Sequence, residues 1–126
     1  MKLKTILQLF ILSLVATSVF SAEPQCSAEH SGYCYYQGKV DRIYVNSGNL
    51  ILMYFDTPMQ TSQALIAGMS ITNGGAAAFK ITENEIFANY FYSTALAAQA
   101  SGRDIVIQMR GVESGYPRFD RVWLAQ

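Results

Sequence analysis

Residues 82–109, TENEIFANYFYSTALAAQASGRDIVIQM, decide the fold of this chain. The first four form a capping box, in which the Thr82 hydroxyl caps the helix and the Glu85 carboxylate reaches back, so a helix is predicted to begin here. Gly102 stands where a left-handed C-cap is needed, and a strand over residues 104–110 follows at once. One helix joined directly to a strand predicts a small, mainly β barrel that carries one α-helix.

The predicted helix has two unlike faces, yet neither is charged. On a helical wheel, one face gathers Ile86, Phe87, Tyr90, Phe91, Thr94, Ala97, Ala98 and Ser101, and we expect it to plug the barrel. The opposite face includes Ala88, Tyr92 and Leu96. No charged residue stands between Glu85 and Arg103, whereas a solvated helix face normally carries Lys, Glu or Arg. We therefore expect Tyr92 and Leu96 to meet another subunit; an exposed but bland face is the alternative.

A hairpin is predicted upstream of the helix. Residues 39–45 and 50–56 are its strands, and the turn sequence NSGN at 46–49 joins them. Both faces of the second strand are apolar, although the outer face of a barrel strand should be polar. That outer face holds Leu50, Leu52 and Tyr54. Either the N-terminal arm, the helix or a neighbouring subunit is expected to cover it.

The remaining segments are predicted less sharply. Residues 65–71 and 77–81 are candidate strands on either side of the turn sequence NGG. Residues 111–117 are expected to be a loop, and residues 118–124 to be the last strand. One of the two candidates, or both, is expected to join the hairpin and the strand after the helix in the barrel.

The N-terminus is typical of a secretory signal peptide. Lys2 and Lys4 precede an apolar run over residues 6–15, and small residues follow. The domains predicted are a signal peptide over 1–22, an N-terminal arm over 23–37 and a barrel over 38–126; cleavage after Ser21 or after Ala22 fits. A retained anchor is the alternative, but the run is shorter than the roughly 20 residues that cross a bilayer. We expect no membrane insertion after cleavage.

Composition limits the partners. The chain has nine Lys and Arg against nine Asp and Glu, with no basic run. Binding to nucleic acid or to anionic lipid through charge needs clustered Lys and Arg. We therefore expect no nucleic-acid partner.

Cys26 and Cys34 are the only cysteines. An exported chain meets an oxidising compartment, so a disulfide between them is predicted within the arm. A zinc site with His30 between the two thiols is the alternative, but it lacks a fourth ligand and matches no common spacing. We expect no metal and no cofactor.

The chain shows little that is needed for catalysis. His30 is its only histidine, and no GxSxG, HExxH or phosphate-binding glycine loop occurs. Asp56, Glu113 and Asp120 are the nominal carboxylates for acid–base chemistry, but single carboxylates are usually solvated. We therefore expect a protein that is not an enzyme.

Aromatic side chains favour a binding function. Rings suit both sugar stacking and protein contact, and a guanidinium beside them can donate paired hydrogen bonds. The residues expected to point outward and bind a ligand are Arg42, Tyr44, Tyr116, Arg121 and Trp123. The alternative is structural: Trp123 caps the barrel end, and both arginines form surface salt bridges.

Several segments resemble one known family. After the signal peptide and the Cys pair come GKVDRI at 38–43, the helix YFYSTALAAQASG at 90–102, the strand IVI at 105–107 and the final RVWL at 121–124. This order resembles the OB-fold B-subunit family of bacterial AB5 toxins, most nearly the subtilase-cytotoxin B-subunit-like exported proteins of Gram-negative bacteria. The resemblance spans residues 38–124.

The resemblance implies an architecture and a function. It implies a five-stranded OB-fold-like barrel capped by a helix, rings of five subunits whose central helices face one another, and binding of host-cell glycans. Toxin B subunits usually tie their disulfide into the barrel, whereas the Cys pair here precedes the first expected barrel strand. No sugar-contacting residue is carried over from the family.

These observations predict a periplasmic or secreted, non-catalytic binding protein of a Gram-negative bacterium. We expect a homo-oligomer, with a pentamer as the family's form, that binds a glycan or a protein partner such as an A subunit. The alternative is a periplasmic inhibitor or immunity protein that blocks a partner enzyme, with the outward aromatic and Arg residues as its interface.

Overall fold

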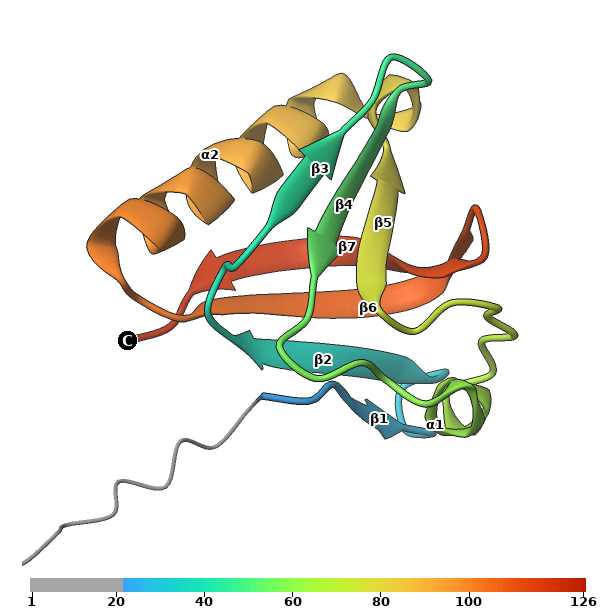
Figure 1. The fold of residues 1–126 in the computed structure, drawn as a ribbon. Helices are drawn as coiled ribbons and strands as arrows, with labels where there is room; N and C mark the ends of the chain where they lie inside the picture. Colours follow the sequence, from blue (N-terminus) through green and yellow to red (C-terminus); the bar gives the residue numbers. More distant parts are fainter. Residues whose placement is uncertain (1–21) are drawn as a thin grey trace, which may run out of the picture.

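The computed structural model describes residues 22–126, which form one β-rich unit (Figure 1). Its elements in chain order are β1 (Gln25–Ser27), β2 (Tyr33–Gly38), β3 (Ile43–Val45), β4 (Leu50–Tyr54), α1 (Thr61–Ile66), β5 (Ala76–Lys80), a 3-10 turn (Ile81–Glu83), α2 (Glu85–Ser101), β6 (Ile105–Glu113) and β7 (Tyr116–Leu124). The predicted signal peptide lies outside the described residues, apart from Ala22.

The strands form one sheet in the order β1-β2-β6-β7-β5-β4-β3. All neighbours are antiparallel except β5 and β7, which run parallel and meet at Ala78 and Arg118. The sheet bends sharply, so that β3, β4 and β5 cross the direction of the other strands, and α2 lies beside the bend (Figure 1). The prediction of a mainly β protein with one main helix is confirmed. The sheet is open, so the predicted closed five-stranded barrel is not confirmed.

The main helix begins two residues later than predicted. Asn84 is its N-cap, and its Oδ1 accepts a hydrogen bond from the amide of Phe87 at 3.0 Å. Thr82 instead lies in the 3-10 turn, so the predicted capping box does not form. The predicted end is confirmed, because Gly102 adopts a left-handed C-cap with φ 67°.

The buried face of the helix is rotated from the predicted one: Phe91 and Ala98 are buried as predicted, but Ala88, expected on the opposite face, is buried as well. The buried residues of the helix are Ala88, Phe91, Ala95 and Ala98. The Phe91 ring stacks on Phe119 with 3.9 Å between centroids. Ile86 and Tyr90, which were expected to point inward, are 71% and 68% exposed. Three alanines let the helix backbone approach the sheet closely, and the bulky Ile86 and Tyr90 remain in solvent.

The predicted N-terminal arm is part of the sheet. β1 pairs with β2, and β2 pairs with β6, so residues 25–38 are not irregular. The predicted disulfide between Cys26 and Cys34 is confirmed, and it joins directly opposite residues of β1 and β2. The bridge therefore ties two strands of the sheet.

Tyr36 anchors β2 in the core. It is fully buried, its hydroxyl donates to the carbonyl of Lys39 at 3.1 Å, and it accepts from the amide of Asp56 at 3.4 Å. Burial raises the pKa of Tyr36 to about 12, because the anionic form would lose its hydration. The hydroxyl thus stays protonated and links β2 to the end of β4.

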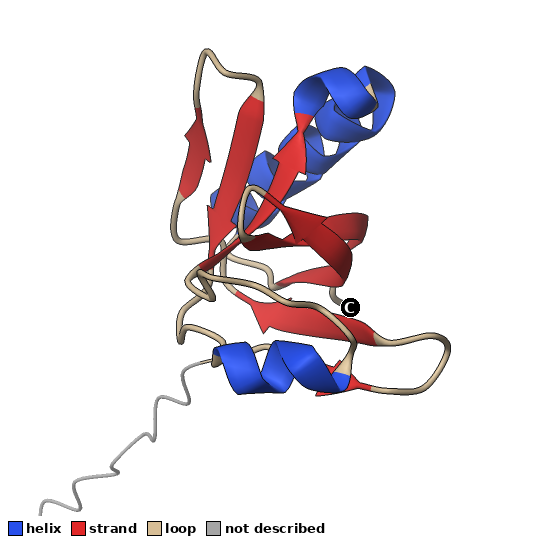
Figure 2. Ribbon diagram, turned by 90° about the vertical axis from the view of Figure 1, so that its right-hand side faces the viewer, coloured by secondary structure: helices blue, strands red, loops and turns tan. Residues whose placement is uncertain are grey.

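Two further segments differ from the sequence prediction. Residues 65–71 do not form a strand; α1 ends within them and packs beside β1, on the opposite side of the molecule from α2 (Figure 2). This contact is tight at Gly32, where a Cβ would lie 2.2 Å from the Ala67 carbonyl oxygen. Residues 111–117 are not a loop, since β6 and β7 extend into them and turn at Ser114 and Gly115. The predicted strand at 77–81 is confirmed as β5.

Candidate functional site

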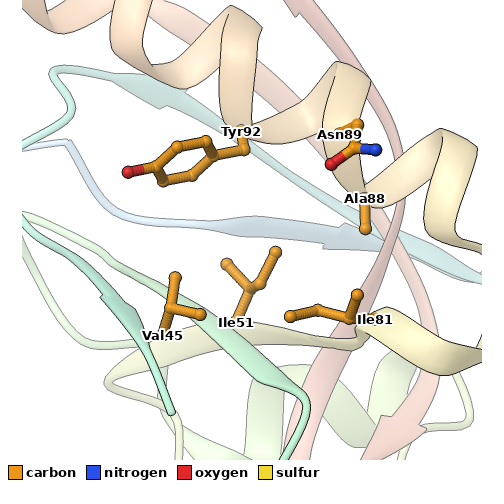
Figure 3. A pocket seen from close by; sticks show the side chains of 6 residues that line it. All are labelled: Val45, Ile51, Ile81, Ala88, Asn89 and Tyr92. Carbon is orange, nitrogen blue, oxygen red and sulfur yellow. The ribbon is translucent and has the colours of Figure 1, made fainter. Parts of the chain in front are cut away.

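An apolar cavity lies between α2 and the β3–β4 hairpin. It measures about 250 Å³ and is lined by Val45, Ile51, Ile81, Ala88, Asn89 and Tyr92. Figure 3 shows the Tyr92 ring and the Asn89 amide projecting from the helix, opposite the three aliphatic side chains of the hairpin and the 3-10 turn. Only the Asn89 amide and the Tyr92 hydroxyl offer polar side-chain atoms.

A second cavity of about 420 Å³ continues the first along the helix. The two share Val45 and Tyr92, and the second is also lined by Asp41, Arg42, Ile43, Leu96 and Gln99. We call the two together the α2–β3 groove. Val45, Tyr92 and Leu96 are all exposed along it. Its only charged lining residues stand at one end, where Gln99 donates to the Asp41 carbonyl.

The groove runs beside an open strand edge. β3 is the last strand of the sheet and pairs only with β4. The Arg42 carbonyl accepts from the Tyr54 amide, and the Asn46 amide donates to the Leu50 carbonyl. Because bonded and non-bonded pairs alternate in an antiparallel ladder, the backbone N–H and C=O groups of Ile43 and Val45 face away from β4. They offer an edge on which another strand can pair.

The predicted interface residues lie in two places. Tyr92 and Leu96 lie on the α2–β3 groove. Leu50, Leu52 and Tyr54 lie on the outer face of β4, where they pack with Ala76, Ala78 and Tyr116. Leu52 is buried there by this cluster, so the chain's own side chains cover the outer face, with no part taken by the N-terminal segment or α2.

The predicted ligand residues do not form one site. Arg42 and Tyr44 are at β3, Arg121 and Trp123 are on β7, and β4 and β5 separate these strands in the sheet. The Arg42 guanidinium lies 3.7 Å above the Tyr54 ring. Tyr116 belongs to the cluster on β4, and Asn73 Nδ2 donates to its hydroxyl at 3.4 Å.

Trp123 and Arg121 share a sheet face with residues that the sequence did not single out. The register places Trp123 beside Val106 and Gln37, and Arg121 beside Gln108 and Tyr35. We call this surface the Trp123 face. Trp123 and Tyr35 are each nearly half exposed, and within residues 22–126 Arg121 forms no salt bridge. Tyr35 and Gln37 were missed because residues 23–37 were treated as an arm.

A polar cavity of about 290 Å³ lies at the start of α2. Its lining residues are Phe79, Glu83, Asn84, Phe87, Arg118 and Asp120. Arg118 forms an ion pair of 2.5 Å with Glu83, and Asp120 lies 3.9 Å from Arg110. Of the three nominal catalytic carboxylates, Asp120 lines this cavity, whereas Asp56 and Glu113 do not.

Neither a metal site nor a membrane span is present in the described residues. Across residues 22–126, no three His, Cys, Asp or Glu side chains lie close enough to hold a metal ion. No helix in that range is long and apolar enough to cross a membrane.

No family model, no curated protein and no solved structure matches this chain. The resemblance to toxin B subunits therefore stays a prediction from the sequence.

Proposed function

We propose that this protein is an exported, non-catalytic binding protein that assembles as a homo-oligomer and binds a glycan, in the manner of a toxin B subunit. One observation carries the proposal: the α2–β3 groove, which has an apolar cavity at one end and exposed Val45, Tyr92 and Leu96 along it, lies beside the open edge of β3. Exposed apolar surface of this kind marks contact with another protein more often than a catalytic site.

The strand order supports a five-stranded barrel of the OB type as the underlying architecture. β2 and β3 follow each other along the chain and are separated only by residues 39–42. When β2 and β3 are taken as one bent strand, that strand pairs with β6 at one end of the sheet and with β4 at the other. β1 is then an extra strand outside the five strands of the barrel. The main helix then lies between the third and fourth strands of the barrel.

A second copy of the chain is the proposed occupant of the α2–β3 groove. Ile43 and Val45 offer backbone hydrogen bonds to a strand of that copy, and Tyr92 and Leu96 offer apolar surface beside it. The groove has little charge with which to select a charged partner, and its exposed apolar side chains gain from burial. The face predicted from the absence of charge on the helix is thus used for assembly.

Leu96→Lys tests the assembly. Leu96 is exposed in the single chain, so the variant is expected to fold normally. A lysine held in an apolar interface leaves an unpaired charge, and association is expected to weaken by about a hundredfold. Size-exclusion chromatography with light scattering should give a multiple of the chain mass for the mature protein and a monomer for the variant.

Ser62→Lys is the matched control, because it adds the same charge to the exposed side of α1, away from the groove. It is expected to assemble like the parent protein. A parent protein that is monomeric at micromolar concentration would contradict the oligomer. In that case a protein partner would become the better candidate for the groove.

The Trp123 face is the proposed glycan-binding surface. The rings of Trp123 and Tyr35 suit the C–H face of a sugar, and Arg121, Gln37 and Gln108 offer hydrogen bonds beside them. Trp123→Ala is expected to weaken binding on a glycan array at least tenfold while leaving the oligomer intact. Tyr90→Ala, which removes an exposed ring from α2, is the control. A parent protein that binds no glycan would contradict this part of the proposal.

Export is supported by the disulfide, and the contacts of Ala22 bear on the cleavage position. The Ala22 carbonyl accepts a hydrogen bond from the Thr57 amide at 2.9 Å, and its side chain packs against the core. Cleavage after Ser21 retains this contact, and cleavage after Ala22 removes it. Fractionation that leaves the intact chain in the cytoplasm would contradict export.

A further inference from the structure

We infer that the second copy in the α2–β3 groove pairs its own β3 with β3 of the first copy, so that the assembly is a two-fold dimer. The inference rests on the proposed self-assembly and adds the strand that pairs, its register and the number of subunits. It departs from the five-membered ring that the resemblance implies. The argument begins with the two outer strands of the sheet, β1 and β3.

The outer strand β1 offers little edge to a partner. It has three residues, and Pro24 before it has no amide hydrogen to donate. The Cα atoms of Cys26 and Cys34 lie 4.0 Å apart, which is closer to the spacing of a non-hydrogen-bonded pair than to that of a bonded one. Cys26 is therefore the one residue of β1 whose N–H and C=O point away from β2. α1 also packs beside this strand, and a short edge with a proline resists pairing.

Within residues 22–126, β3 is thus the outer strand whose edge is free for pairing. A ring of subunits needs two different surfaces on each copy, one for each neighbour, whereas a two-fold contact uses the same surface twice. Because strand pairing has this single edge to use, β3 meets β3, and the assembly closes at two copies.

The register follows from the direction of the backbone groups in β3. Ile43 and Val45 direct their N–H and C=O groups away from β4. An antiparallel pair centred on Tyr44 sets Ile43 opposite Val45 of the second copy, and each such pair exchanges both of its N–H···O bonds. A pair centred on Ile43 would instead set Val45 opposite Asp41, whose carbonyl already accepts from Gln99. The centre at Tyr44 uses every free group of the strand.

The side chains of β3 fit this two-fold register. Tyr44 stands opposite Tyr44 of the second copy, and its ring, which is 46% exposed in the single chain, gains an aromatic partner. Ile43 and Val45 both line the groove, so they meet the same two residues of the second copy on that side. The contact therefore buries apolar side chains on both faces of the strand pair.

Charge does not oppose the contact. The register sets Arg42 opposite Asn46 of the second copy and Asp41 opposite Ser47, so no charge faces a like charge.

The two grooves join across the two-fold axis. Directly opposite residues of a strand pair point to the same face of a sheet, so the two α2 helices lie on the same side of the continuous sheet. Tyr92 and Leu96 of both copies then line one shared groove.

Tyr44→Cys tests the register, because the two-fold axis sets this residue opposite itself. A non-hydrogen-bonded antiparallel pair brings the Cβ atoms to the separation that a disulfide needs. The oxidised variant is expected to form a covalent dimer, seen at twice the chain mass on a non-reducing gel. Trp123→Cys, at an equally exposed ring on β7, is the control and is expected to remain a single chain.

Val45→Pro tests the strand pairing, because it removes an amide that the β3–β4 ladder does not use. Association measured by light scattering is expected to weaken by about tenfold or more, with an unchanged circular dichroism spectrum. Val45→Ala is the matched control, since it trims the same side chain but keeps the amide, and its loss is expected to be smaller. Equal losses in the two variants would show that the backbone of β3 does not pair and would overturn the inference.

Light scattering of the mature oxidised parent protein separates this inference from the proposed function. Twice the chain mass is expected. A larger multiple, or no covalent dimer of the Tyr44→Cys variant, would overturn the two-fold pairing and leave the proposed oligomer standing. A monomer at micromolar concentration would overturn both.

Discussion

Replacing Phe91 with alanine is expected to lower the free energy of unfolding by about 3–5 kcal/mol. Phe91 is fully buried, and its ring stacks on Phe119 at the centre of the contact between α2 and the sheet. Truncation removes the transfer energy of the ring and leaves a cavity that flanking alanines cannot fill. For a domain of this size the midpoint of thermal unfolding should fall by about 15 °C or more. Urea unfolding followed by circular dichroism measures the change.

Tyr90→Ala is the matched control, since it removes an adjacent ring from the exposed side of the same helix. Its effect is expected to stay within about 0.5 kcal/mol. The pair of variants tests the rotation of α2 directly, because the helical wheel placed both rings on the buried face. Equal destabilisation by the two substitutions would show that the helix docks as the wheel predicts.

Removing the disulfide is expected to cost about 2.5 kcal/mol, the chain-entropy value for a loop of this length. Cys26→Ala with Cys34→Ala is the variant, and the loss should appear in both thermal and urea unfolding. β1 is a short edge strand that the bridge ties to β2, so its amides should also exchange faster with solvent. Ser27→Ala, at the neighbouring position of β1, should change little. A double variant as stable as the parent would show that β1 is held by pairing alone.

The C-terminal end of the helix was predictable because only one residue met the local conformational requirement, whereas the N-terminal end had two candidates. Gly102 was identified because only a left-handed residue ends the helix there. The start was misplaced because Thr82 and Asn84 are both good N-caps. Packing decides between them, since a start at Asn84 lets Phe87 contact Phe79 and Phe91 contact Phe119.

The buried face of the helix was not predictable from its sequence alone. With no charge after Glu85, the helix has no polar stripe to identify the solvent side. The wheel favoured Ile86 and Tyr90 because they are large and apolar. The sheet instead selects alanines, since close approach of the backbone matters more there than the size of a side chain.

The candidate sites also differ in how far the local sequence could predict them. Tyr92 and Leu96 could be singled out from the sequence, because the absence of charge around them is visible locally, but the groove that they line was not predicted. The polar cavity could not be predicted, because Glu83 and Arg118 are distant in sequence and meet only through the fold. Tyr35 and Gln37 were missed for another reason: β2 alternates buried Cys34 and Tyr36 with exposed neighbours, and neither buried residue is strongly hydrophobic.

The pairing of β2 with β6 also sets the order in which the molecule can be completed. β2 lies near the N-terminus, and its partner lies in the last quarter of the chain. A chain that emerges N-terminus first can form the β3–β4–β5 meander from neighbouring residues, but Tyr36 has no strand to bury it until Ile107 has emerged. Contacts between such distant segments slow folding and prolong the exposure of unpaired strands. Loss of the last two strands would therefore leave an apolar half-sheet prone to aggregate.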